Sequence, residues 1–544
     1  MSDDVVGKLA KPSLISRLFG AGRQPLRLVA VPRDHVIGDR ARGDALLAGR
    51  LSVGSETISL AEVDFATLGS TTALAREIQG FGWLRDLAAS ASREKGARLA
   101  EAIAGRWLIA HGTRIDDAWS PDLWGQRILH WTAYAPYMLS SRDTSYRSAL
   151  LNTFARGARH LDTHADKAAP GLPRITAWAG VVVGALTLHG GMAKLTRGES
   201  GLMRALSAAQ YEDGGLMSRS PQEQMLLVDR LGLVRASYFA AKQTLPDALE
   251  NAAAAALAAL HGVTMGDGAL SSWQGGNPGD AQRVGALVDG CGLRARPLRA
   301  ARGWGYQRMS ALGTVIVLDA APPPPPRMAA AGCASTLAIE ISDGAQRLVV
   351  NCGGPGALPT DLPRALIDAL RTTAAHSTLV IDDTNSTAIL ADGSLGKGVA
   401  DVVIDRGEDN DSSRLEASHD GYARGFGLIH QRRLFLGNDG KEVRGEDILS
   451  PKGRRKTREA VPFAIRFHLA PGIEPTVTAD GMGAILRSPG APAWNFRCRG
   501  AMIMIEESLV IDQRGRTMAT LQLVVVGEVS GAGGEIAWQF RRSS

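Results

Sequence analysis

Two periodicities divide this 544-residue chain into a helical first half and a strand-rich second half. Between about residues 60 and 300, apolar side chains recur every three or four positions, as at Leu99, Ile103 and Trp107. The same period continues through residues 124–138, 151–161, 175–188, 225–241 and 248–260. Proline and glycine breaks separate these segments. Successive helices joined by short loops are therefore predicted, as in an α/α solenoid or toroid.

After about residue 300 the pattern becomes that of β-strands. The predicted strands are short apolar runs, many of them bounded by Gly, Asp or Asn. They are residues 314–318, 337–341, 347–351, 379–381, 463–469, 502–506, 519–526 and 536–540. So many strands without intervening helices favour an antiparallel sandwich. The proline run at 322–326 lacks backbone donors and is predicted to be a surface loop.

The predicted fold is therefore α+β and multidomain: an N-terminal incomplete α/α toroid followed by a large antiparallel β-sandwich. The expected division is an N-terminal extension at 1–60, a toroid domain at 61–300 and a sandwich domain at 301–544. An apolar content of 45% supports real cores in both domains.

The net charge of +6 favours anionic partners, such as an acidic polysaccharide, a nucleic acid or a membrane surface. The basic residues are dispersed and no recognition motif is found, so no nucleic acid is expected. The densest basic cluster, residues 452–458, is interpreted as a solvated loop, with a polyanion contact as the alternative. No cofactor is expected, because neither a phosphate-loop motif nor a dinucleotide fingerprint is convincing.

Residues 1–31 contain no apolar run long enough for a signal-peptide core, and no transmembrane helix is predicted. A cytoplasmic location without membrane insertion is therefore expected. The four cysteines are scattered and form no CxxC pair, so buried free thiols are expected rather than disulfides or a zinc site.

Six stretches, in one order along the chain, resemble motifs of the heparinase II/III family. The first contains Asp213-Gly214-Gly215 and, shortly after it, Arg219-Ser220-Pro221. The others lie at residues 305–319, 337–353, 371–378, 418–433 and 466–471. The resemblance implies a toroid followed by a sandwich, and β-elimination on an anionic, uronate-containing polysaccharide. It also implies export, so a periplasmic location is the alternative expectation.

Lyase chemistry of this kind needs a neutralised substrate carboxylate, a base for the C5 proton and an acid for the leaving O4 oxygen. The resemblance places the family's residues for these tasks, and for binding metal in some members, at positions that differ here. Those positions are Leu172, Pro173, Glu223, Gln224, Cys333, Ser335 and Asn351. Of the metal-binding set only His376 is kept, so no metal site is expected. Any catalysis would need a rearranged site.

The candidate acid and base residues are His419 and Tyr422, in the polar stretch 418–422, together with His376. A structural hydrogen bond is the alternative role for each of them. The candidate substrate-binding residues are basic, acidic or aromatic side chains near the cleft that the family resemblance implies between the toroid and the sandwich. They are Arg219, Glu223, Trp273, Tyr306, Arg308 and Arg432.

These binding candidates also have structural alternatives. Arg308 could clamp a carboxylate or form an inter-domain salt bridge. Trp273 could stack on a sugar ring or pack in a core. Arg219 and Glu223, four positions apart, could pair on a helix.

Two functions follow from these observations. The first is a divergent polysaccharide lyase that acts on an anionic glycan. The second is a non-catalytic glycan-binding or scaffold protein that keeps the family fold.

Overall fold

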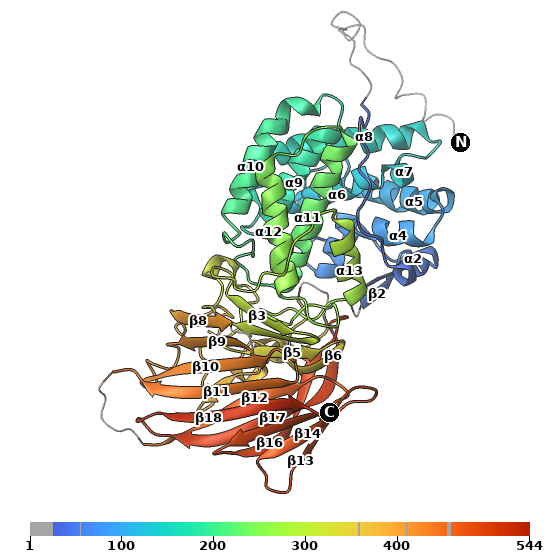
Figure 1. Ribbon diagram of the computed structural model, residues 1–544. Coiled ribbons are helices and arrows are strands. Elements are labelled where there is room, and N and C mark those ends of the chain that lie inside the picture. Colours follow the sequence, from blue (N-terminus) through green and yellow to red (C-terminus); the bar gives the residue numbers. More distant parts are fainter. Residues whose placement is uncertain (1–25, 55, 357–359, 409–411, 454–458, 544) are drawn as a thin grey trace, which may run out of the picture.

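The computed structural model describes residues 26–54, 56–356, 360–408, 412–453 and 459–543. Helices form the first part of the chain and two large antiparallel sheets form the second (Figure 1). No helix in these ranges is long and apolar enough to cross a membrane. The helices of the first part are α2 (Arg40–Leu47), α3 (Ala73–Gly80), α4 (Trp83–Ser90), α5 (Arg93–His111), α6 (Pro121–Ala133), α7 (Ala135–Met138), α8 (Thr144–His164), α9 (Leu172–Thr187), α10 (Leu195–Ser207), α11 (Pro221–Ala240), α12 (Asp247–Gly262) and α13 (Ala281–Gly290).

Helix α9 is the centre of the helical part. Every residue from 175 to 187 is buried, because α9 packs against α6, α10 and α11. A helix that is apolar on all sides is stable only when neighbours cover it in this way. Gly125 of α6 allows a close approach, since a Cβ there would lie 2.2 Å from the Thr176 oxygen of α9.

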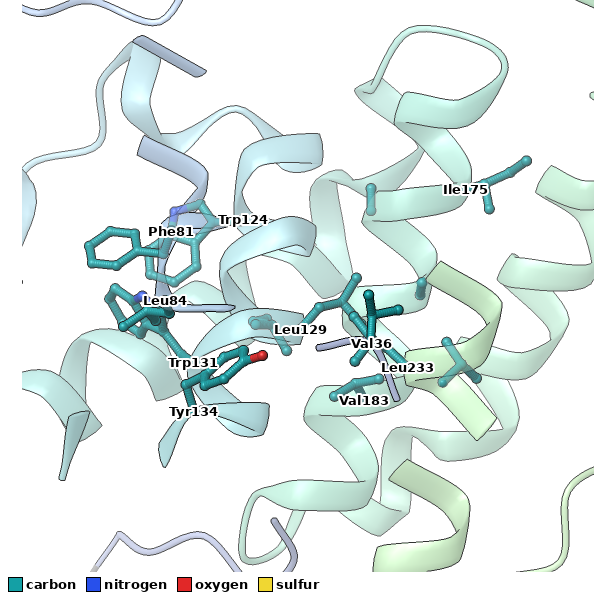
Figure 2. Packing of buried hydrophobic residues seen from close by; sticks show 14 of the residues in the cluster. Val36, Phe81, Leu84, Trp124, Leu129, Trp131, Tyr134, Ile175, Val183 and Leu233 are labelled. Carbon is teal, nitrogen blue, oxygen red and sulfur yellow. The ribbon is translucent and has the colours of Figure 1, made fainter. Parts of the chain in front are cut away.

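An aromatic cluster fills the core between the first helices of this part. Phe81, Trp124 and Trp131 lie close together in Figure 2, and the rings of Phe81 and Trp131 meet edge to face at 5.2 Å. Val36, from the segment before α2, and Leu233 of α11 belong to the same buried cluster (Figure 2).

Residues 26–60 differ from the expected N-terminal extension. Leu46 of α2, Leu51 of β1 (Arg50–Val53) and Leu60, which follows β2 (Glu56–Ser59), belong to the same core as the toroid helices. This described part of the extension is therefore integral to the helical domain. The apolar side chains between residues 36 and 65 explain this difference, because they leave water by packing against that core.

The second part of the chain forms a β-sandwich. One sheet has the order β13-β14-β15-β18-β11-β10-β9-β8, and the other has the order β16-β17-β12-β6-β5-β4-β3, with β7 paired to β12. The strands are β3 (Tyr306–Ala311), β4 (Thr314–Asp319), β5 (Ile339–Asp343), β6 (Gln346–Val350), β7 (Leu379–Ile381), β8 (Val402–Glu408), β9 (Ser412–His419), β10 (Leu428–Gly437), β11 (Glu442–Pro451), β12 (Val461–Leu469), β13 (Glu474–Val477), β14 (Gly483–Arg487), β15 (Trp494–Arg499), β16 (Met502–Ile511), β17 (Thr517–Val529) and β18 (Gly534–Arg542).

The sandwich core forms because inward and outward side chains alternate along the strands. In β10, residues alternate between buried and more exposed, which places Leu434 and Leu436 inside. Phe467 of β12, in the other sheet, meets Phe540 of β18 at 5.4 Å between ring centroids. The predicted toroid-then-sandwich fold is therefore confirmed.

Candidate functional site

Arg219 lies at the junction of the helical part and the sandwich, just before α11. Its backbone is left-handed, with φ of 57°, and its side chain is 1% exposed. The guanidinium donates to Asp319 at 2.5 Å and to the carbonyl oxygens of Trp304 and Pro322, each at 2.9 Å. Burial lowers the pKa of Arg219, but the Asp319 carboxylate outweighs it and leaves that pKa raised. Arg219 therefore pairs across the junction with Asp319, and not with Glu223 along a helix.

Tyr306 and Trp273 pack against this ion pair. The Tyr306 hydroxyl donates to the Arg219 carbonyl oxygen at 2.7 Å, and the guanidinium lies 4.9 Å from the centre of the Tyr306 ring. The Trp273 ring centroid is 5.5 Å from that of Tyr306. Both aromatic side chains are buried, and burial raises the pKa of Tyr306 well above its ordinary value. A tyrosine base needs the opposite shift.

Glu223 and Arg308 are less buried than the other binding candidates. Burial raises the pKa of Glu223, which lies in the first turn of α11. Arg308 of β3 donates to the Thr264 carbonyl oxygen at 2.5 Å, just beyond the end of α12. Burial, together with Arg299, lowers the pKa of Arg308 to about 10. Arg308 thus joins the two parts through a backbone carbonyl rather than a carboxylate.

The other positions that the family resemblance singled out are also bonded within the protein. Gln224 is buried and bonds to Leu216 N–H and to the carbonyl oxygens of Gly214 and Ala256. The Cys333 N–H donates to the Gln274 side chain at 2.9 Å.

Ser335 and Asn351 lie close by with partners of their own. The Ser335 hydroxyl donates to Asp319 at 2.7 Å, and the Asn351 amide donates to Glu340 at 3.1 Å. These groups complete a polar network that closes the junction.

His376 is buried beside this network. Its Nδ1 lies 2.7 Å from the Thr372 carbonyl oxygen, so Nδ1 carries the proton and donates it to that oxygen. Burial lowers the pKa of His376, which keeps the ring neutral. His376 directly follows the 3-10 turn Thr373–Ala375, whereas His419 ends β9.

His419 belongs to a buried chain of polar groups in the sandwich. The Gly421 N–H donates to His419 Nδ1 at 3.0 Å, so His419 carries its proton on Nε2. That nitrogen is 3.2 Å from His430 Nδ1, and His430 Nε2 is 2.7 Å from Asp447. The protons therefore point one way along the chain, from His419 to His430 to Asp447. Burial lowers the pKa of His419 well below its ordinary value.

Arg432 and Tyr422 are fixed in the same region. Arg432 grips the Asp447 carboxylate through two nitrogens at 2.8 and 2.9 Å, and donates to the carbonyl oxygens of Leu337 and Ser377. The Tyr422 hydroxyl donates to the Leu379 carbonyl oxygen at 2.8 Å, and burial raises its pKa. Sequence reasoning missed Asp447, for which no direct signal exists, although His430 and Arg432, two apart on β10, share the inward face.

One group of described residues has a spacing that could hold a metal ion. Asp34, His35 and Asp229 offer ligand atoms within 4.8 Å of one another. Arg85, however, donates to Asp34 and to Asp229 at 2.8 Å. The positive charge that these carboxylates need is therefore already supplied, and the group serves to fasten the N-terminal segment to α4 and α11.

Comparisons with known proteins show what this chain is similar to. Residues 293–539 match the profile described as "Heparinase II/III-like, C-terminal". The chain is 29% identical over 553 aligned residues to "FtsZ-localized protein C" of Caulobacter vibrioides (strain NA1000 / CB15N), with 97% of this chain and 92% of that protein covered.

Solved structures with the same fold are polysaccharide lyases. A crystal structure of heparinase III matches with a TM-score of 0.70 and 12% identity, covering 92% of this chain and 84% of that one. A mutant of the heparan sulfate lyase HepC from Pedobacter heparinus matches with a TM-score of 0.62 and 14% identity, covering 93% and 83%. At these identities the likeness shows the fold, a toroid followed by a sandwich. The sandwich, at residues 293–539, is the part that matches the heparinase II/III-like C-terminal family.

Proposed function

We propose that this chain is a non-catalytic member of its family, which keeps the lyase fold as a scaffold and works where FtsZ assembles. One observation carries the first half of this proposal. The three acid and base candidates, His376, His419 and Tyr422, are 1–2% exposed. Each is hydrogen-bonded to another group of the protein. A polysaccharide cannot reach them while these bonds hold.

The charges of these groups support the same proposal. A base for the C5 proton needs a pKa near the working pH and direct contact with the substrate. Burial raises the pKa of Tyr422 and Tyr306, which disfavours the tyrosinate form. Arg219 and Arg432, which could neutralise a uronate carboxylate, are already paired with Asp319 and Asp447.

The second half of the proposal rests on the relative. "FtsZ-localized protein C" aligns with nearly the whole of this chain, so its location is the natural hypothesis for this protein. The proposal includes a cytoplasmic address rather than the periplasmic one that the family resemblance implies. The four cysteines are buried free thiols, which suits a reducing compartment.

Pelleting with FtsZ polymers tests the proposal. FtsZ from the organism that encodes this chain would be polymerised with GTP and sedimented with the purified protein. Enrichment of the protein in the pellet with GTP, and not with GDP, is expected. If the protein stays in the supernatant under both conditions, the proposed link to FtsZ is wrong.

The competing function is a divergent lyase that acts on an anionic polysaccharide. The fold favours it, because the matching solved structures are glycosaminoglycan lyases. Such an enzyme would have to open the junction around Arg219, or use side chains other than the nine candidates. A third possibility is a non-catalytic scaffold that binds a glycan. Its glycan binding would survive the loss of His419 and Tyr422.

A further inference from the structure

A cavity lies on the helical part, away from the junction and from every candidate described above. Its volume is about 510 Å³, and its walls come from the segment before α2, the start of α5, α7 and the first two turns of α8. Helix α8 is at the end of the helical part remote from the sheets (Figure 1). A volume of this size is in the range of small-molecule sites, about 300–1,000 Å³.

Three arginines line this cavity: Arg27, Arg93 and Arg147. No aspartate or glutamate is among the lining residues. None of the three guanidinium groups forms an ion pair with a carboxylate of the described residues, whereas Arg85, Arg219 and many others do. Three cations gathered without a counter-charge repel one another, and an anion bound among them would relieve that repulsion.

Arg93 is fixed in place by hydrogen bonds to residues that line the cavity. Its Nε and Nη2 donate to the Ser140 hydroxyl at 3.0 and 2.9 Å, which holds the guanidinium at the wall of the cavity. Thr144 and Ser148 also line this space, whereas the Ser140 hydroxyl is occupied, since it accepts from Arg93 and donates to the Pro136 carbonyl oxygen. Arginine and hydroxyl donors together suit the several acceptor oxygens of a phosphate or a carboxylate.

The rest of the lining is apolar. Leu28, Val31, Leu139 and Leu151 contribute to it, and Val31 is 45% exposed although it is a large hydrophobic residue. Simple inorganic anions leave such a surface in contact with water. A ligand with an apolar body would cover that surface and gain from its burial.

We propose that this cavity binds a small anionic amphiphile, a phosphate or carboxylate head joined to an apolar body, with Arg93 and Arg147 holding the head. The site goes beyond the scaffold function, because it lies outside the junction and needs none of the residues there. The amphiphile could be a free metabolite or the headgroup of a lipid, and the two sources share this chemistry.

Isothermal titration calorimetry on the full chain tests the proposal with three probes: n-hexyl phosphate, inorganic phosphate and n-hexyl glucoside. Hexyl phosphate is expected to bind saturably and at least ~10-fold more tightly than inorganic phosphate, since only it fills the charged and the apolar parts. Hexyl glucoside, which lacks the charge, is expected not to bind. Equal binding of hexyl phosphate and hexyl glucoside, or no saturable binding of hexyl phosphate, would overturn the proposal.

Arg147→Gln is the informative variant, because the Arg147 side chain forms no hydrogen bond or ion pair with the described residues, so its loss should not disturb folding. It is expected to weaken hexyl phosphate binding by roughly 10-fold, as for the loss of one charge-assisted hydrogen-bonding group. Arg98→Gln, on the exposed face of α5, is the matched control and should bind as the parent does. Equal affinity of Arg147→Gln and Arg98→Gln would also overturn the proposal.

Sedimentation with vesicles separates the two sources of the ligand. If the source is a lipid, the protein pellets with phosphatidylglycerol vesicles and not with phosphatidylcholine vesicles, and Arg147→Gln abolishes this. If the protein binds hexyl phosphate but ignores both kinds of vesicle, the source is a free anion. Either result supports the proposed chemistry, whereas vesicle binding that Arg147→Gln leaves intact counts against the cavity as the site.

Discussion

The Arg219 guanidinium and the Asp319 carboxylate form a buried ion pair between the helical part and the sandwich, with Nη2 and Oδ1 2.5 Å apart. The two residues are 100 positions apart in the chain. The pair lies at the junction of the helical part and the sandwich, where the family resemblance implies a substrate cleft. The same contact therefore joins the two parts and withdraws Arg219 from any substrate.

The first prediction concerns this ion pair. Asp319→Ala leaves Arg219 buried without a counter-charge, and is expected to lower the free energy of unfolding by about 3–5 kcal/mol. Chemical denaturation followed by circular dichroism measures the loss. The control is Glu94→Ala, which removes the 3.4 Å pair with Arg98 on the exposed face of α5. That change should cost about 1 kcal/mol or less. Equal losses for the two variants would show that the junction does not depend on this pair.

The second prediction concerns how the free energy of unfolding depends on pH. Burial lowers the pKa of His468 to about 3, with its Nε2 bound to the Ala374 carbonyl oxygen and its Nδ1 to Ser508. Below its ordinary pKa of about 6.5, the unfolded chain binds a proton that the folded chain refuses. The free energy of unfolding should therefore fall as pH drops from about 6.5 towards 3, by about 1.4 kcal/mol per pH unit for this group.

Urea unfolding at about pH 7 and at about pH 5 measures this dependence. Between about pH 7 and about pH 5, the free energy of unfolding of His468→Gln should fall by about 2 kcal/mol less than that of the parent. His189→Gln removes an exposed histidine instead, and should leave the fall unchanged. An unchanged fall in His468→Gln would mean that His468 is protonated in the folded protein.

The third prediction concerns the thiols. Burial raises the pKa of Cys333 and of Cys352 to about 12 each, and Cys291 and Cys498 are also buried. Because the thiolate is the reactive form, a thiol reagent such as Ellman's reagent should label the folded protein slowly. All four thiols should react rapidly once the protein is unfolded in guanidinium. Rapid labelling of one or more thiols in the folded protein would contradict the burial described here.

Helices and strands could be predicted from the sequence where the pattern of apolar residues was strong. The predicted strand at residues 379–381 coincides with β7, and the helix predicted at 175–188 overlaps α9. Strands β8 to β11 were not predicted, because their outward positions carry charged residues and β10 has His430 and Arg432 facing inward. Helix α10 (Leu195–Ser207) was also missed. The proline run at 322–326 lies outside the strands, as predicted.

In the candidate site, the residues with which the candidate side chains pair were harder to predict than the candidates themselves. Motif spacing located Arg219, Tyr306 and Arg432, but no local pattern indicates that Asp319 and Asp447 neutralise the two arginines. Such pairings depend on how the parts dock. The basic cluster at 452–458 lies mostly outside the described residues, and its first residue, Lys452, is 3.7 Å from Asp420.

The central claim is that the chain keeps the fold of a lyase without its chemistry. The most direct measurement is the ultraviolet absorbance of the unsaturated product, followed while the protein is incubated with heparin-like, chondroitin-like and alginate-like chains. The account predicts no product above the rate without protein. Product formation that Tyr422→Phe abolishes, while the variant unfolds at the parent's denaturant midpoint, would contradict it.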